Sequence, residues 1–325
     1  MLQVLLTVDT EISDPMPADW RKAGLEGQIE RDILGATDHG QFGLPFQLAT
    51  LKQHNLKAVF FVEALFASAS EANRTALART VRMVESAGQE VQLHLHPEWL
   101  ARTGRTLPPG RKGRDLAEFT EDEQALLIQE GFENLKSCCA APVTAFRAGN
   151  FGADGRTLKA LARNGFLFDS SYNACYLGYT CRIEHAERLT RPTLINGVTE
   201  YPIATFSDWP GHLRPAQICA CSAREMRNAL DGAWRAGWKS FVLLWHSFEL
   251  IKRPKIPGQT AHPDWLAIKR FQQLCRFLDE NRDRFVTRGF HDLETAPEGT
   301  AHPILQSPVQ HTVWRMIEQV AGRFY

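Results

Sequence analysis

Short apolar runs alternate with amphipathic stretches along most of the chain, which is the pattern of strands and helices in α/β proteins. Strands are predicted at residues 3–8, 57–62, 90–96, 143–147, 166–169 and 240–246, and helices at residues 71–87, 120–137 and 263–282. The run at residues 57–62 is continuously apolar, which is typical of a strand buried on both faces of a parallel sheet. Seven or eight such β/α units predict a barrel, open or closed, rather than an open sheet.

Polar or charged residues stand at the carboxyl ends of six predicted strands. These residues are Asp9, Glu63, His96, Arg147, Asp169 and His246. Because α/β barrels gather their active sites at this end of the strands, the six residues predict one shared site. A single one of them, such as Glu63 or Asp169, could instead cap the turn that follows its strand.

Two histidines, His94 and His96, lie two residues apart at the end of an apolar strand. The side-chain period of a strand is two, so both imidazoles project to the same face and could bind one metal ion. Burying two histidines is costly unless their ring nitrogens are satisfied. The alternative to a metal site is a pair of hydrogen-bonded histidines in a core or cleft.

Composition bears on three questions: whether the chain spans a membrane, whether it binds an acidic partner, and in which compartment it lies. The 325 residues are 44% hydrophobic, enough for one large core or two moderate ones, and no apolar run approaches the ~20 residues of a membrane span. Because 37 basic residues balance 37 acidic ones, net charge predicts neither a nucleic-acid nor an acidic-membrane partner. The seven cysteines form no C-x-x-C pair and the first residues lack signal-peptide features, so we expect reduced thiols and a cytoplasmic location.

An ordered set of short motifs carries a family resemblance. The motifs are Thr7–Glu11, Leu51–Val62, the strand with His94 and His96, Arg147–Asn150, Asp169–Tyr172 and Leu244–His246. In order and spacing the chain resembles the polysaccharide deacetylase family, the NodB-homology group (carbohydrate esterase family 4-like). The resemblance implies a distorted (β/α)7 barrel over residues 1–295, followed by a C-terminal extension at residues 296–325. It also implies metal-dependent hydrolysis of an amide, usually the N-acetyl group of an amino sugar.

The resemblance also assigns catalytic roles. Asp9 stands where the family keeps its general base, and Arg147 where it keeps a residue that orients that carboxylate. His246 stands where it keeps the general acid, with Asp169 holding the histidine. These pairings suit their roles, because an arginine keeps a neighbouring carboxylate ionised and a carboxylate favours the imidazolium.

The chain departs from the family in its metal-binding carboxylate. The family usually has a second aspartate directly after the first, whereas this chain has Thr10 there. Glu11 is the nearest replacement and would face the same way as Asp9 on an extended backbone. We therefore expect one divalent ion, with Zn²⁺ the conservative choice, held by Glu11 and the two histidines, although the opposite roles for Asp9 and Glu11 remain open.

Two further departures indicate a divergent subfamily. The family's histidines are usually four residues apart, not two, and the proline and tyrosine expected after the arginine are replaced by Gly149 and Asn150. The expected activity is removal of an N-acyl group from an amino sugar or a glycan precursor. The alternatives are an amidohydrolase for a non-sugar carbon–nitrogen bond and a non-catalytic carbohydrate-binding protein.

Several segments could shape the substrate pocket. The basic loop at residues 97–119 could hold an anionic group of the substrate or could be a solvated loop. His39 could line the pocket or belong to a plain turn, and Trp209 and Trp245 could stack on sugar rings or belong to the core.

The end of the chain carries an amphipathic helical pattern at residues 311–324. Its apolar face consists of Val313, Met316, Ile317, Val320 and Phe324. Packing against the barrel or against a second subunit is the expected use, and membrane contact is the alternative.

Overall fold

A computed structural model describes residues 1–12, 24–102, 113–253, 259–293 and 301–321. The chain divides into two compact units, each assembled from separate segments. The first unit contains residues 1–58, 206–287 and 304–325, and the second contains residues 59–205 and 288–303. The boundary between residues 1–295 and the C-terminal extension stays a prediction.

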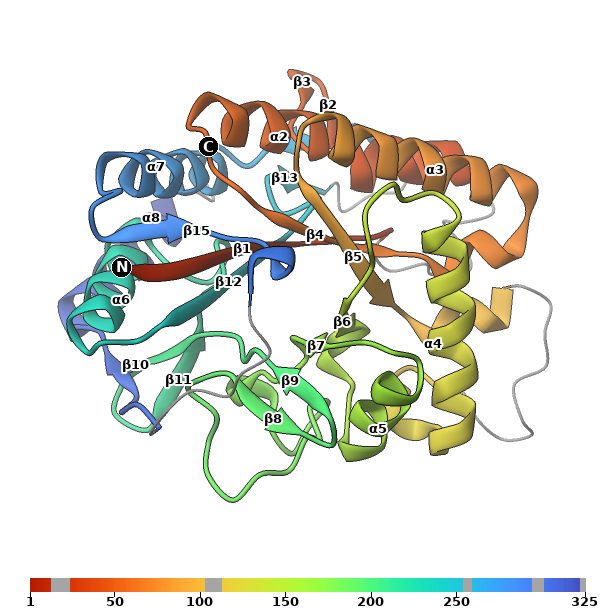
Figure 1. Cartoon of the computed structure of the whole chain (residues 1–325). Helices are drawn as coiled ribbons and strands as arrows, with labels where there is room; N and C mark the ends of the chain where they lie inside the picture. Colours follow the sequence, from red (N-terminus) through yellow and green to blue (C-terminus); the bar gives the residue numbers. More distant parts are fainter. Residues whose placement is uncertain (13–23, 103–112, 254–258, 294–300, 322–325) are drawn as a thin grey trace. The chain divides into compact units, whose positions relative to one another are not determined.

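The first unit is organised around parallel strands at its centre. Strand β1 (Leu2–Thr10) pairs with β12 (Ser240–His246) and with β15 (Phe285–Thr287), as Figure 1 shows. The register of the first pair runs from Gln3 opposite Ser240 to Asp9 opposite His246. Apolar side chains bury both strands, as their sequences predict. The register therefore places two of the expected site residues side by side at the strand ends.

Helices and short strands complete the first unit. Its helices are α2 (Leu44–Gln53), α6 (Ala223–Arg235), α7 (Trp265–Glu280) and α8 (Val309–Ala321), with a π-helical turn at Ile29–Ile33. Its short strands are β2 (Ala36–Thr37), β3 (Gly40–Gln41), β10 (Thr205–Trp209), β11 (His212–Pro215), β13 (Ile251–Lys252), β14 (His262–Pro263) and β16 (Leu305–Gln306).

The second unit has a parallel sheet with one antiparallel edge. Its parallel strands follow the order β4 (Val59–Glu63), β5 (Glu90–Leu95), β6 (Ala145–Ala148), β7 (Phe168–Asp169) and β9 (Val198–Glu200), and β8 (Thr193–Ile195) is the antiparallel edge. Its helices are α3 (Glu71–Ser86), α4 (Glu121–Lys136) and α5 (Gly155–Arg163). Short 3₁₀ turns lie at Leu65–Ala69, Pro97–Arg102, Leu116–Glu118, Gly149–Phe151, Ala174–Tyr176 and Phe290–Asp292. Helices α3 and α4 both contact β5 (Figure 1).

Local sequence signals account for where several helices begin. The Thr120 hydroxyl accepts a hydrogen bond from the Glu123 amide, and the Glu123 carboxylate accepts one from the Thr120 amide at 2.7 Å. This reciprocal pair confirms the capping box predicted for α4. Ser222 and Glu225 form the same arrangement at the start of α6.

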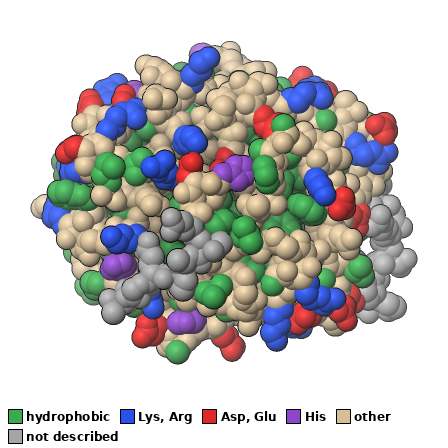
Figure 2. Space-filling model, in the orientation of Figure 1, with side chains coloured by type: hydrophobic (Ala, Val, Ile, Leu, Met, Phe, Trp, Pro, Cys, Tyr) green, Lys and Arg blue, Asp and Glu red, His purple; other side chains and the backbone are tan. Residues whose placement is uncertain are grey.

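Charged side chains of both signs are interspersed over the surface. On the face drawn in Figure 2, basic and acidic groups alternate around the periphery, as expected for a chain whose formal net charge is zero. Among the described residues, no helix combines the length and apolar character that crossing a membrane requires.

Helix α8 lies where the C-terminal amphipathic helix was predicted, but it buries polar residues and exposes its apolar face. Its buried residues are Thr312 and Arg315. The side chains expected to pack against the barrel are instead about half exposed, at 46% for Val313, 57% for Met316, 51% for Ile317 and 56% for Val320. Packing against the barrel is therefore wrong for these four residues, packing against a second subunit stays a prediction, and Phe324 lies outside the described residues.

The reason for this orientation is a buried ionic network around Arg315. Its guanidinium donates to the Asp208 carboxylate at 2.9 Å and to the Glu225 carboxylate at 3.1 Å. Arg214 donates to the same Asp208 carboxylate, and burial, which raises the pKa of Asp208, is outweighed by hydrogen bonds from His212 and Arg214 that lower it. Two buried carboxylates therefore depend on cations, one of which α8 supplies.

We expect Arg315→Met to destabilise the protein by about 3 kcal/mol, because it leaves two buried carboxylates short of a cation. The measurement is the urea midpoint followed by tryptophan fluorescence. Arg74→Met is the matched control, since Arg74 pairs with Glu71 on the surface and should have little effect. An unchanged midpoint for Arg315→Met would show that the network does not anchor α8.

Candidate functional site

The expected site residues divide between the two units. Asp9, Glu11 and His246 belong to the first unit, and His94, His96, Arg147 and Asp169 belong to the second.

In the first unit, two carboxylates converge on one histidine. The His246 Nε2 atom lies 3.9 Å from Asp9 Oδ2 and 3.9 Å from Glu11 Oε1. Both carboxylates are buried. This arrangement follows from the strand period, because Asp9 and Glu11 are two residues apart at the end of β1 and β12 places His246 opposite Asp9.

The other nitrogen of His246 meets a residue that the sequence reading missed. Glu249 Oε1 lies 2.6 Å from His246 Nδ1, so Nδ1–H donates to this carboxylate. Glu249 is itself held, since Oε1 accepts from Gln217 Nε2 at 2.5 Å and Oε2 accepts from the Cys219 amide at 3.3 Å. The resemblance gave Asp169 the task of holding His246, whereas in the first unit Glu249 performs it.

The surroundings of His246 favour its protonated form. Burial lowers the pKa of His246, but the hydrogen bond to Glu249 and the charges of Glu249, Glu11 and Asp9 raise it, with a net result of about 9. The ring also stacks on Phe248, with centroids 5.0 Å apart. The imidazolium is thus oriented from one side and held among carboxylates, as a proton donor requires.

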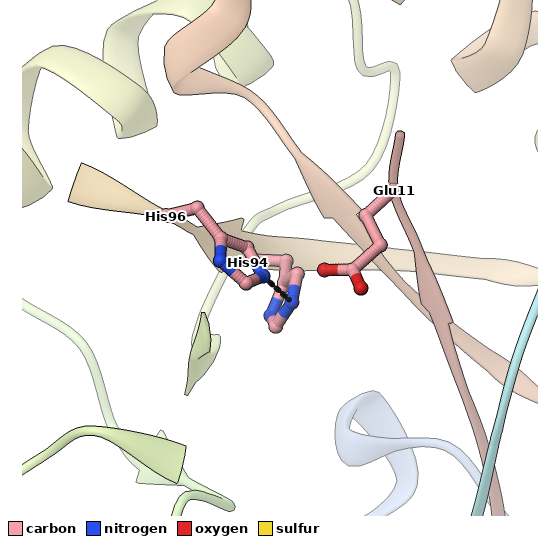
Figure 3. Close-up of side chains that lie close together, drawn as sticks. All are labelled: Glu11, His94 and His96. Atoms are coloured by element: carbon pink, nitrogen blue, oxygen red, sulfur yellow. Dashed lines mark hydrogen bonds between the residues drawn. The ribbon is translucent and has the colours of Figure 1, made fainter. Parts of the chain in front are cut away.

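In the second unit, two imidazoles face each other across a short gap. The Nε2 atoms of His94 and His96 are 3.2 Å apart (Figure 3). The His94 Nδ1 lies 2.8 Å from the carbonyl oxygen of Arg147, to which it donates, so His94 Nε2 keeps its lone pair. His96 Nδ1 lies 3.3 Å from Glu98 Oε1. Both Nε2 atoms therefore point to the same place, while the other nitrogen of His94 makes a hydrogen bond and that of His96 lies near a carboxylate.

This geometry fits a metal ion. Zinc–imidazole bonds are about 2.0–2.1 Å long, so two such ligands on a tetrahedral ion lie roughly 3.3 Å apart. The 3.2 Å between the two Nε2 atoms matches that separation. The hydrogen bond from His94 to a backbone carbonyl is the contact that orients a metal-binding histidine. The pair thus fits a divalent ion with borderline ligand preference.

A glycine explains why the departures from the family pattern occur together. A Cβ atom at Gly149 would lie 2.5 Å from atoms of the His96 ring, far inside contact distance. A proline at position 149 could not fit beside this ring. The next residue, Asn150, has a φ of 56°, which asparagine tolerates better than tyrosine. In this chain, therefore, the place of the His96 ring requires the glycine at position 149.

Glu63 has a structural task in this region. Its Oε1 accepts from the Leu65 amide at 2.7 Å, and its Oε2 accepts from the His96 amide at 2.5 Å. These contacts agree with the alternative that Glu63 caps the turn after its strand. The same carboxylate fixes the backbone of His96.

Arg147 and Asp169 lie in a fully buried cluster. The Arg147 guanidinium donates to the Ser170 carbonyl and hydroxyl, both at 2.9 Å, and covers the Phe61 ring at 4.3 Å. The Asp169 carboxylate accepts from the Ser171 hydroxyl at 2.7 Å. Burial raises the pKa of Asp169, and burial together with the charge of Asp169 raises the pKa of Glu200 well above its usual range. Burial and mutual repulsion therefore favour the neutral form of Glu200 beside Asp169.

Most of the predicted pocket residues have other surroundings. Trp245 is fully buried and its Nε1 donates to Gln47 Oε1 at 3.1 Å, which agrees with the alternative that it belongs to the core. Trp209 is 52% exposed. His39 lies in the exposed turn between β2 and β3, which agrees with the plain-turn interpretation.

The basic loop is only partly described. Residues 103–112, with three of its cations, lie outside the described residues, and so does the side chain of Arg102. Of the rest, Trp99 is buried against Phe66, and the Arg114 side chain is 74% exposed. Its proposed contact with an anionic group stays a prediction.

Comparisons with known proteins identify the fold. No protein-family model and no curated protein matches the chain. A presumed polysaccharide deacetylase from Mycobacterium smegmatis superposes with a TM-score of 0.52 at 17% identity, over 93% of this chain and 96% of that one. The Bc1960 peptidoglycan N-acetylglucosamine deacetylase gives 0.43 at 18% identity over 88% and 85% of the two chains. A family 4 carbohydrate esterase from Streptomyces lividans gives 0.42 at 12% identity over 94% and 98%.

The first of these similarities carries the assignment of the fold, because it extends over nearly the whole of both chains. It agrees with the parallel strands and intervening helices described above. The resemblance drawn from the sequence motifs is confirmed at this level. The chain has a distorted (β/α)7 fold like that of the Mycobacterium smegmatis protein.

Proposed function

We propose that the protein is a metal-dependent hydrolase that removes an N-acyl group, most simply N-acetyl, from an amino sugar or a glycan precursor. The observation that carries the proposal is the pair of imidazole Nε2 atoms facing each other at 3.2 Å, on a fold that polysaccharide deacetylases share. The buried His246, oriented by Glu249 and close to two carboxylates, supports acid–base chemistry.

For the metal, we propose His94, His96 and Glu11 as the ligands and Zn²⁺ as the ion. Each of the three buried residues offers one ligand atom of a type that zinc accepts. When bound, a divalent ion would polarise the acyl carbonyl and lower the pKa of water. Asp9 then remains to act as the general base.

The residues of the chain perform the proton transfers in this proposal. Asp9 takes a proton from the attacking water as the new carbon–oxygen bond forms at the acyl carbon, and Arg147 takes the role of orienting that carboxylate. His246 gives its Nε2 proton to the departing nitrogen as the carbon–nitrogen bond breaks. The products are a carboxylate and a free amine; the proton held by Asp9 returns to solvent, and His246 regains a proton from solvent.

In this scheme Glu249 positions the acid, and Glu249→Gln should lower kcat about 100-fold with little change in KM. The amide keeps the size of the side chain but removes the charge that favours imidazolium. Glu249→Asp should restore part of the activity, and Glu280→Gln, at the exposed end of α7, is the matched control. Full activity in Glu249→Gln, combined with a large loss of kcat in Asp169→Asn, would return the role to Asp169.

We also propose a cytoplasmic protein that meets a sugar or a soluble glycan precursor, which the free state of all seven cysteines supports. An anionic group on the substrate stays a prediction from the basic loop. Neither proposal affects the assignment of the reacting residues.

The test of the function combines metal analysis with acetate release. We expect about one equivalent of metal in the purified protein and acetate release from a panel of N-acetylated sugars, oligosaccharides and nucleotide-linked sugars. Metal without acetate from any sugar, but with hydrolysis of non-sugar amides, would favour the amidohydrolase. Neither metal nor hydrolysis after incubation with zinc, manganese or cobalt would favour the non-catalytic carbohydrate-binding protein.

A further inference from the structure

Helix α8 is an amphipathic helix with its polar side turned inward. Its buried residues are Thr312 and Arg315, each about 5% exposed. Its large apolar side chains, 43–57% exposed, are Val309, Val313, Trp314, Met316, Ile317 and Val320. Surface helices of globular proteins normally bury their apolar stripe, so an outward stripe needs its own explanation.

Polar contacts within the first unit fix this orientation. Arg315 donates to Asp208 and Glu225, and the Thr312 hydroxyl donates to the carbonyl oxygen of Asp208 at 2.9 Å. Arg270 of α7 donates to Glu318 at 3.0 Å. Rotating the helix to bury its apolar side would break all of these bonds and leave buried charges unpaired. The outward stripe is therefore a stable feature of the fold.

The stripe has the spacing of a helix–helix seam. Val309, Val313, Met316, Ile317 and Val320 follow one another at intervals of four, three, one and three residues, so they share one face of the helix. Trp314 lies beside them, with the Arg224 guanidinium 4.9 Å from its ring centroid. A second helix of the same kind could pack its own stripe against this face.

We propose that the α8 stripe binds α8 of a second copy of this chain, in an antiparallel pair about a twofold axis. A twofold interface uses the same patch on both partners, which an apolar stripe on one straight helix can satisfy. The exposed apolar side chains amount to roughly 500 Å² per copy, so a symmetric pair would bury about 1,000 Å², near the lower limit for a specific interface. The proposal does not depend on the proposed function.

The charges of α8 favour this partner over a membrane surface. Helices that lie on membranes are rich in lysine and arginine on their polar face. Helix α8 has no lysine, and its one arginine, Arg315, is buried in ion pairs. A lipid surface would therefore gain apolar contact but no attraction from α8 itself.

The test is sedimentation equilibrium of the full chain over a wide range of concentration. The wild type should approach about 73 kDa, twice its mass of 36.7 kDa. The double variant Met316→Glu, Ile317→Glu should raise the dissociation constant at least tenfold, because it places carboxylates at the centre of the seam. Val320→Glu, further along the stripe, should weaken the dimer as well.

The matched control is Leu126→Glu, which changes a still more exposed apolar residue on α4. It should leave the mass unchanged, and circular dichroism should show that every variant folds. A monomeric wild type at all concentrations would overturn the proposal, and so would a double variant that dimerises like the wild type. Wild-type binding to vesicles of equimolar phosphatidylcholine and phosphatidylserine, lost in the double variant, would instead assign the stripe to lipid.

Discussion

Replacing both His94 and His96 by alanine should remove the bound metal and lower hydrolysis at least ~1,000-fold. The two Nε2 atoms face each other at 3.2 Å. Among the described residues of the second unit, no other two imidazoles are placed so that both could bind one ion. The double variant keeps the backbone bond between the His96 amide and Glu63. The measurement is metal per chain by mass spectrometry after identical purification, together with acetate release.

The matched control removes two other histidines. His39 and His262 lie on exposed turns and strands of the first unit and both approach Asp38. The variant His39→Ala, His262→Ala should keep its metal and its activity. If the His94, His96 variant retains one equivalent of metal, the ion binds elsewhere and the proposed hydrolase mechanism fails.

The sequence predicts those features that depend on neighbours along the chain. Apolar runs specify β1 and β12, and the capping box at Thr120 and Glu123 specifies the start of α4. The strand period likewise predicts that His94 and His96 project to one face, because two residues on a strand differ by a full pleat. These signals are local, so one sequence suffices to read them.

Contacts made by turns and by packed elements could not be predicted in this way. Glu249 follows His246 by three residues in the turn after β12, where its amide donates to the His246 carbonyl at 3.1 Å. No periodicity assigns a side chain in such a turn to a strand residue, so its carboxylate was overlooked in favour of Asp169. A glutamate three residues after a histidine in a predicted turn is a sequence signal, because such a turn can bring the two side chains together.

The barrel alternative for the apolar face of α8 failed for a different reason. An amphipathic pattern shows which residues share a face but not whether that face meets the same chain. Arg315 reads as a surface residue until Asp208 and Glu225, about a hundred residues away in sequence, are placed beside it. Long-range ion pairs therefore determine which face of α8 is buried, and hydrophobic periodicity alone does not show this.

Asp9→Asn and Glu11→Gln should separate the two carboxylates by their effects. Both lie 3.9 Å from His246 Nε2, so this distance does not distinguish base from ligand. Asp9→Asn should keep about one equivalent of metal and lower kcat about 1,000-fold, because an amide cannot accept the water proton. Glu11→Gln should weaken metal binding at least ~100-fold, because a neutral amide is a poor zinc ligand.

Metal titration and single-turnover hydrolysis on the same preparations make the comparison decisive. Excess metal should restore activity to Glu11→Gln but not to Asp9→Asn, since only the first defect is one of affinity. The reverse pattern would exchange the roles of the two residues and leave the proposed reaction intact. Loss of metal in both variants would make both carboxylates ligands, and the base would then have to come from a residue other than Asp9.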